Sequence, residues 1–150
     1  MQTRRSNACR GCWVGNDAND LIRLVQLPVE SDRRGRLTAI ENHDLPFQMQ
    51  RVYYLYDIPS GESRAGHAHW HLEQILISAA GSFDVTLDDG TAREMVTMNR
   101  PSVGLHISSM TWREIDNFSS GAVCLVLASA PFSEDDYIRD YDAFRATVSR

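Results

Sequence analysis

The sequence predicts an all-β fold that ends in one short helix. Three observations point to this class. From residue 21 onward, short runs rich in Val, Ile, Leu and aromatic residues follow one another closely; turn-forming residues separate these runs; and apolar residues at helical spacing occur only near the C-terminal end. Many short strands joined by tight turns are typical of a sandwich, a jelly roll or a barrel with antiparallel pairing.

The expected strands are bounded by residues that favour turns. Their apolar content and alternation place them at residues 22–29, 37–41, 51–58, 72–79, 82–87, 92–98, 104–107, 112–115 and 122–128. The turns fall at residues 32–35, 59–61, 88–90, 99–101 and 119–121, where glycine, proline, serine, aspartate and asparagine gather. Glycine supplies positive φ angles, proline fixes φ, and the small polar side chains bond their own backbone, so each cluster reverses the chain.

The C-terminal region differs from the rest in its spacing. Ser133 can cap a helix, and the three acidic residues at 134–136 suit the positive end of a helix dipole. Apolar residues then recur at helical intervals at Tyr137, Ile138, Tyr141, Phe144 and Val148. We therefore expect one helix from residue 133 onward, whose apolar stripe packs on the outside of the sheet. Its tyrosines are expected to pack there and not to form a cofactor site.

Composition and charge exclude several classes of protein. The chain carries 15 Arg, no Lys and 20 acidic residues, for a net charge of −5. Nucleic-acid binding needs a concentrated basic face, which scattered arginines in an acidic chain do not provide, although their planar guanidinium groups still suit a small phosphorylated ligand. No apolar run is long enough to span a bilayer, and the basic start lacks the apolar segment of a secretory signal, so a cytoplasmic protein is expected. Residues 1–20 are expected to form a flexible tail and residues 21–150 a single domain.

The three cysteines do not form a disulfide framework. Cys9 and Cys12 have the spacing of half a zinc site, but no second pair follows them, and their role stays open. Cys124 lies in a fully apolar run and is expected to be an inert core thiol.

The most informative stretch is a histidine cluster, Gly-His-Ala-His-Trp-His-Leu-Glu at residues 66–73. Strand side chains alternate between the two faces of a sheet, so His67, His69, His71 and Glu73 are expected to point the same way. The apolar run that follows continues the strand and directs these side chains toward the interior. Burying imidazoles is costly without a partner or a task. We interpret the cluster as a functional site, the alternative being histidines satisfied by ordinary hydrogen bonds.

These residues resemble a known pattern. Gly61, His67, His69, Glu73 and Gly81 fit the first cupin motif, and residues 104–117 fit the second loosely. More specifically, the chain resembles the dTDP-4-keto-6-deoxyglucose 3,4-ketoisomerases over roughly residues 21–146. The resemblance is carried by residues 51–54, 64–69, 72–74, 81–82, 87–90, 104–105, 117–120, 126–129 and 136–142. It implies a cupin-type jelly-roll β-barrel with a ligand site at its mouth, and a homodimer.

The resemblance also implies an activity. Family members interconvert the 4-keto and 3-keto forms of a dTDP-6-deoxyhexose through an enediol, in deoxysugar or amino-sugar biosynthesis for a surface polysaccharide or a glycosylated natural product. By motif, His67 and His69 match the acid/base pair, with no metal and no cofactor. Imidazole suits both proton roles because its unperturbed pKa is about 6.5. Which of the two meets the sugar carbon, and whether the product is galacto or gluco, stays open.

Substrate contacts are expected from a further set of side chains. Guanidinium groups would hold the diphosphate, aromatic rings would stack on thymine or cover the sugar, a histidine would hydrogen-bond the sugar and a carboxylate would adjust the pKa of the imidazoles. The set comprises Arg51, Tyr53, Arg64, Glu73, His106, Trp112 and Arg113. For each arginine the alternative is a surface salt bridge, and for each aromatic residue a place in the core.

Arg113 departs from the family, whose members usually have histidine between the equivalents of Trp112 and Glu114. In metal-binding cupins this position supplies the last histidine ligand, and a cation there would repel a divalent metal. Two other functions stay open. His67, His69 and Glu73 are the ligand types of a metal-dependent cupin oxygenase, and the same fold can serve as a non-catalytic nucleotide-sugar-binding protein.

Overall fold

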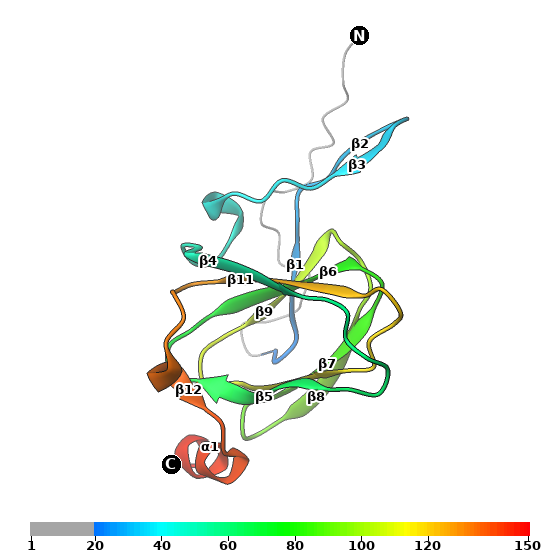
Figure 1. Ribbon diagram of the computed structural model, residues 1–150. Helices are drawn as coiled ribbons and strands as arrows, with labels where there is room; N and C mark the ends of the chain where they lie inside the picture. The colour runs from blue at the N-terminus through cyan, green and yellow to red at the C-terminus, as the bar shows by residue number, and fades with distance from the viewer. Residues whose placement is uncertain (1–19) are drawn as a thin grey trace.

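The computed structural model describes residues 20–150 and shows two five-stranded antiparallel sheets that face each other (Figure 1). The first sheet has the order β1 (Arg23–Gln26), β9 (Val103–Ile107), β6 (Gln74–Ala80), β11 (Val123–Ala128) and β4 (Arg51–Leu55). The second has the order β12 (Tyr137–Ile138), β5 (Arg64–His69), β10 (Trp112–Asp116), β7 (Phe83–Asp88) and β8 (Arg93–Met98). A separate hairpin of β2 (Glu30–Asp32) and β3 (Gly35–Leu37) projects from the barrel (Figure 1). The predicted all-β jelly-roll fold is confirmed.

Most strands lie where the alternation of apolar residues predicts them, with ends shifted by a few residues. Two regions differ. The strand expected at 37–41 is instead the second arm of the projecting hairpin, which ends at Leu37, and the chain then forms a 3-10 turn, η1 (Asn42–Asp44). The histidine cluster does not lie on one strand, because β5 ends at His69 and β6 begins at Gln74.

The space between the sheets is filled by apolar side chains from both. Its buried members are Leu76, Phe83, Val85, Leu87, Met98, Leu105, Ile107, Ile115, Cys124 and Val126. Burial raises the pKa of the Cys124 thiol to about 12, so this cysteine is a packing residue, as its apolar run predicts. Cys9 and Cys12 lie outside the described residues.

The first sheet is covered on its outer face as well. A second buried cluster lies there, beneath residues 40–49 of the same chain, and comprises Val25, Leu27, Ile75, Ile77 and Leu127. Both faces of β6 are therefore buried within one chain. The apolar residues on both faces of β6 are thus covered without a second copy of the chain.

The single helix expected from residue 133 onward is divided. Residues Glu134–Asp136 form a 3-10 turn, η2, and the next two residues form β12, which pairs with His69 and Ala68 of β5. Only α1 (Tyr141–Val148) is an α-helix. Helical spacing alone predicted a longer helix, and pairing with the edge of β5 replaces its first half.

The helix α1 packs where its apolar stripe predicts. Its N-cap is Asp140, whose carboxylate accepts a hydrogen bond from the backbone N–H of Ala143 at 2.7 Å. Phe144 is fully buried against Trp112, on the outside of the second sheet. No helix in residues 20–150 is long and apolar enough to cross a membrane.

We predict that Gly81, in the turn between β6 and β7, does not tolerate alanine. Its φ is +66°, and a Cβ would lie 2.5 Å from Ser119 Oγ and 2.9 Å from the backbone Cα of Ala122. The Gly81→Ala variant should lose about 1–2 kcal/mol of unfolding free energy through its φ angle and a further loss of about 1–3 kcal/mol through overlap.

Urea unfolding measures both parts of this loss when Gly121→Ala is the control. Gly121 has a φ of +71° and open space around its Cα, so it reports the backbone cost alone. Equal losses of unfolding free energy in Gly81→Ala and Gly121→Ala would show that the residues around Gly81 move aside for the added methyl group at no extra cost.

Candidate active site

A bulge in β5 sets the direction of the first histidine. The pairing of β5 with β10 shifts by one residue, from Arg113 opposite His67 to Glu114 opposite Ala65, which leaves Gly66 as the extra residue. Ala65 and Gly66 both have positive φ angles, of 67° and 77°. A bulge breaks the alternation of side chains and redirects them. As a result Arg64, Ala65 and His67 all line one cavity.

This cavity has a volume of about 330 Å³ and lies between the two sheets. Each sheet and the C-terminal segment contribute polar side chains to its wall. They are Tyr53 and Gln74 from the first sheet, Arg64, His67 and Arg113 from the second, and Tyr137 and Arg139 from the chain around β12. The amide of Gln74 donates a hydrogen bond to the Tyr53 hydroxyl at 2.8 Å, which fixes one side of the wall.

Arg113 is the most unusual member of the site. Its side chain is only 1% exposed, and none of its three guanidinium nitrogens has a hydrogen-bond partner within residues 20–150. Burial lowers its pKa to about 10, so the group still carries its charge at neutral pH. A buried cation without partners is costly, and such a group in a cavity wall is suited to an anionic ligand or to negative charge that develops during a reaction.

His67 and His69 lie side by side, as the alternation along β5 predicts. Their ring centroids are 4.8 Å apart, and the Tyr137 ring lies 4.8 Å from His67 and 4.3 Å from His69. Burial lowers the pKa of each imidazole to about 3, with the Arg113 cation as the next cause. Both rings are therefore neutral at pH 7 and able to accept a proton.

Glu73 and His106 do not lie in this cavity. They pair with each other at 2.7 Å, between Glu73 Oε2 and His106 Nε2. His106 lies opposite Ile75 in the β6–β9 pairing and near the Phe47 ring, which places it on the outer face of the first sheet. The expectation that Glu73 shares a face with the histidines of β5 is wrong, because the chain turns between β5 and β6.

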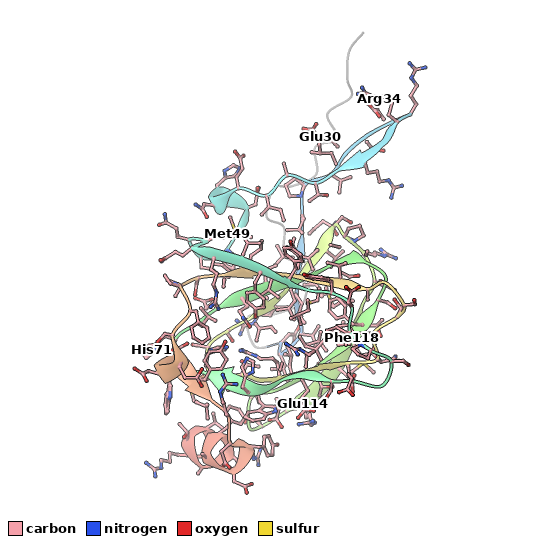
Figure 2. The ribbon with its side chains drawn as sticks, viewed as in Figure 1. Glu30, Arg34, Met49, His71, Glu114 and Phe118 are labelled. Atoms are coloured by element: carbon pink, nitrogen blue, oxygen red, sulfur yellow. The ribbon has the colours of Figure 1, made fainter. Side chains whose placement is uncertain are left out.

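Trp112 and His71 also lie outside the first cavity. Trp112 packs in the cluster beneath α1, and its indole N–H donates to Glu114 Oε1 at 3.0 Å. Since Arg113 faces the cavity, its neighbours on β10 must face outward, and Glu114 lies on the outer side of the second sheet (Figure 2). His71 is exposed at the edge of the molecule (Figure 2).

Arg51 lines a separate cavity next to the first one. Its guanidinium carbon lies 5.2 Å from the centroid of the Tyr53 ring and 5.7 Å from that of Phe132. The structure thus brings together four of the expected residues in the first cavity, Tyr53, Arg64, His67 and Arg113, with His69 in contact behind them.

Among the members of the wall that sequence reasoning missed are Gln74, Tyr137 and Arg139. A signal for Gln74 was available, since it alternates with the inward-facing Leu76 along β6. Tyr137 and Arg139 fall in residues 136–142, a run that carried the family resemblance, but helical spacing assigned Tyr137 to packing. Only its pairing with β5 shows that it lies beside the two histidines.

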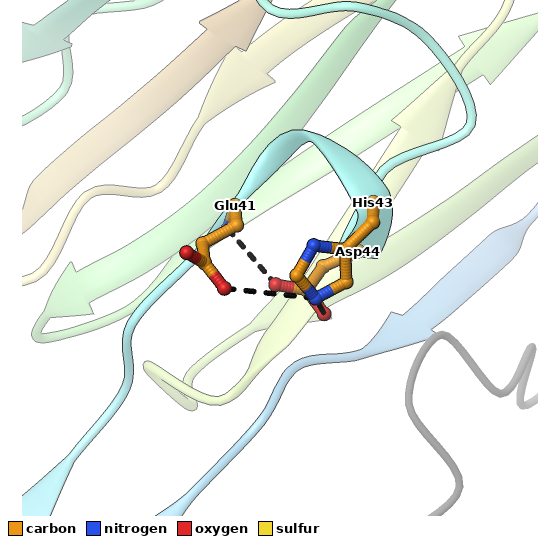
Figure 3. Close-up of side chains that lie close together, drawn as sticks. All are labelled: Glu41, His43 and Asp44. Carbon is orange, nitrogen blue, oxygen red and sulfur yellow. Dashed lines mark hydrogen bonds and ion pairs between the residues drawn. The ribbon is translucent and has the colours of Figure 1, made fainter.

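The three residues expected as metal ligands of an oxygenase do not converge, because Glu73 is directed away from His67 and His69. Within the described part of the chain, the three ligand-type side chains that do converge are Glu41, His43 and Asp44 (Figure 3). They belong to the segment that covers the outer face of the first sheet. Asp44 Oδ2 accepts a hydrogen bond from the Glu41 backbone N–H at 2.9 Å, so capping of η1 accounts for this arrangement.

Comparison with known proteins matches this geometry to a family. The family model described as FdtA, WxcM-like, C-terminal, matches residues 20–149. A relative from Aneurinibacillus thermoaerophilus, a TDP-4-oxo-6-deoxy-alpha-D-glucose-3,4-oxoisomerase, is 45% identical over 120 residues, which cover 79% of this chain and 86% of the relative. The chain belongs to the FdtA family. The family expected from the sequence is thereby confirmed.

Solved structures of 3,4-ketoisomerases agree. A 3,4-ketoisomerase from Helicobacter canadensis is 43% identical, with a TM-score of 0.83 over 86% of this chain and 98% of that one. The 3,4-ketoisomerase QdtA of Thermoanaerobacterium thermosaccharolyticum is known as a mutant in complex with TDP-4-keto-6-deoxyglucose. That structure is 37% identical, with a TM-score of 0.83 over 86% of this chain and 94% of that one.

We predict that Arg113→Met stabilises the unliganded protein. Methionine fills a similar space without a buried, unpartnered charge, so the unfolding free energy should rise, by up to about 1–4 kcal/mol. The pKa of His67 and of His69 should rise as well, because a nearby cation is removed. Urea unfolding and NMR titration of the histidines measure the two effects.

Arg93→Met serves as the control for the change of side chain. Arg93 is half-exposed and pairs with Glu114 Oε2 at 3.0 Å, so its replacement removes a partnered charge and should give no gain in stability. An Arg113→Met variant as unstable as this control would show that the guanidinium stabilises the fold.

Proposed function

We propose that the protein is a TDP-sugar 3,4-ketoisomerase, which interconverts the 4-keto and 3-keto forms of a TDP-6-deoxyhexose in deoxysugar biosynthesis. The observation that carries the proposal is the buried, unpartnered Arg113 in one cavity wall with the neutral imidazole of His67. The relatives that match along most of the chain act on such sugars or catalyse this isomerisation by name. This combination supplies a base and a cation where the reaction needs both.

The reaction moves a carbonyl by one carbon. A base removes the proton at C-3, and the electron pair of that C–H bond forms a C-3=C-4 double bond while the C-4 oxygen gains negative charge and then a proton. Loss of the proton from the 3-hydroxyl and addition of a proton at C-4 complete the change. His67 lines the cavity and is the group we assign to the sugar carbon. His69, in contact behind it, accepts and returns protons, and Arg113 stabilises the enediolate oxygen.

Positive charge around the cavity suits the diphosphate of the substrate. Arg64 and Arg139 line the same wall as Arg113, within a chain whose net charge is −5. Guanidinium groups form paired hydrogen bonds with phosphate oxygens. Tyr53 and Tyr137 offer ring faces on which the thymine or the sugar can rest. We assign the diphosphate to Arg64, and to Arg139 once it leaves its ion pair with Glu134, which joins Nε to Oε1 at 2.8 Å. We assign the reacting sugar to the part of the cavity beside His67.

The oxygenase alternative lacks its third ligand, since Glu73 pairs with His106 on the outer face of the first sheet. Elemental analysis of the purified protein for bound metal separates the two functions. Activity that chelators abolish and iron restores would favour the oxygenase.

Binding of a TDP-sugar without turnover would favour the non-catalytic alternative. A cytoplasmic location stays a prediction from the sequence.

We predict that His67→Asn and His69→Asn retain folding and TDP-sugar binding but lose turnover. Asparagine keeps polarity and approximate size without a titratable ring, and loss of a positioned proton-transfer group costs on the order of 10²-fold or more. NMR in deuterated water follows both product formation and exchange of the C-3 hydrogen. His43→Asn, at an exposed histidine remote from the cavity, is the control. Wild-type turnover in both active-site variants would refute the mechanism.

We further propose a homodimer, supported by the exposed edge of the first sheet. Val52 and Tyr54 on the edge strand β4 are 50% and 58% exposed, and an unpaired apolar edge favours association. Sedimentation should give the mass of two chains for the wild type, and Tyr54→Glu should shift it toward one chain. Met95→Glu, on β8 at an edge of the second sheet, should leave the mass unchanged. A wild-type monomer at micromolar concentration would contradict the dimer.

A further inference from the structure

We propose that Asp136 and His71 form a proton path that connects His69 with solvent on the side away from the substrate cavity. This inference rests on the proposed isomerase function and goes beyond it, since it gives roles to two residues outside the sugar-binding wall. Asp136 acts through His69 and is a positioning residue, and His71 is the outer end of the path.

Two cavities meet at the histidine pair. The first, described above, includes His67 in its wall. The second has a volume of about 340 Å³, and its polar wall includes His69, His71 and Asp136. Tyr137 lines both cavities and separates them. A sugar in the first cavity therefore covers His67 while His69 keeps access to the second.

Asp136 lies between the inner and the outer imidazole. Its Oδ2 is 3.2 Å from His69 Nδ1, and its Oδ1 is 3.4 Å from His71 Nδ1. These are ion-pair separations, and a small rotation of either ring would align a hydrogen bond. Exposure of the side chains rises along the series, from 1% for His69 to 20% for Asp136 and 85% for His71. The series thus runs from the interior of the barrel to solvent.

The backbone holds the carboxylate in this position. Asp136 Oδ1 accepts a hydrogen bond from the His71 N–H at 2.9 Å, and Oδ2 accepts one from the Leu72 N–H at 3.1 Å. These two contacts connect η2 to the turn between β5 and β6. Because the turn carries His71 and follows directly on His69, the carboxylate keeps its place relative to both rings.

Charge around His69 explains why a carboxylate is needed. The titratable and charged groups that face or influence it are His67, Tyr137, Arg51, Arg113, Arg139 and Asp136. Asp136 is the acidic member of this set. Three cations disfavour a second proton on His69, so a proton taken from the sugar must leave quickly. When a small ring rotation aligns the Nδ1–H of His69 with Asp136, Nε2 is left as the proton acceptor.

The transfer conserves protons and electrons. The C-3–H bond breaks, its electron pair stays on the sugar as the enediolate, and His67 takes the proton. The rings of His67 and His69 meet edge to face with centroids 4.8 Å apart, and rotation into hydrogen-bond contact lets His67 pass the proton to His69 Nε2. The Nδ1 proton of His69 moves to Asp136, which gives a proton to His71 Nδ1, and His71 releases its Nε2 proton to water. The reverse transfers bring one proton from water to C-4. The second cavity can therefore exchange protons while the substrate fills the first.

The test uses His71→Gln, because His71 is exposed and its loss should not affect folding. We expect kcat to fall with KM unchanged, and a larger solvent isotope effect on kcat. Imidazole added to the buffer should restore the rate of this variant and leave the wild type unaffected. His43→Gln, an exposed histidine that also lies beside two carboxylates, is the matched control and should behave as the wild type. Asp136→Asn should lose more, about 10–100-fold, the scale found for carboxylates that orient metal-ligating histidines.

The outcomes separate the path from the isomerase function. A His71→Gln enzyme with wild-type kcat, an unchanged isotope effect and no response to imidazole would overturn the path while leaving the isomerase intact. A wild-type product that contains no solvent deuterium would overturn it too, because the proton would then stay with the sugar and His67. Absence of any turnover in the wild type would remove both proposals. If Asp136→Asn fails to fold, the kinetic results of the His71→Gln variant still decide whether the path exists.

Discussion

A guanidinium buried without a hydrogen-bond partner is the constraint on which the site depends. Arg113 extends from β10 into the space between the sheets, where its charge is expensive to keep. The apolar core on both sides of the first sheet provides the stability that tolerates this cost. Burial, together with this cation, keeps the neighbouring imidazoles neutral, and the guanidinium offers the N–H groups of three unpartnered nitrogens to a ligand. The unliganded site is therefore prepared for negative charge.

Most of the polar groups around Arg113 are held by strands. His67 and His69 lie on β5, and a bulge at Gly66 sets the direction of the first. Tyr53 and Gln74 belong to the facing sheet and bond to each other. Side chains on paired strands vary little in position, which suits a reaction that requires a base and a cation at fixed distances from one sugar.

The fold could be predicted because alternation of apolar residues is a local signal that survives in most strands. The pair His67 and His69 was found by the same rule, since both residues lie on one uninterrupted piece of β5. The rule gave the wrong face for Glu73 because the chain turns after His69, and no local sequence pattern predicts that turn. The alternation rule also holds for Trp112. Adjacent residues on a strand face opposite sides, so Trp112 and Arg113 cannot both face the cavity. Tyr137 required knowledge of a pairing between distant segments, which periodicity does not contain.

The short strand β12 has a consequence for how the protein opens. It is two residues long, lies at the edge of its sheet and contributes Tyr137 to the walls of both cavities. Edge segments of this kind open at a lower free energy than central strands. Release of η2, β12 and α1 would dismantle the catalytic wall while leaving the paired strands of the barrel in place. We therefore expect heat to abolish function before it unfolds the barrel, with the C-terminal segment opening first.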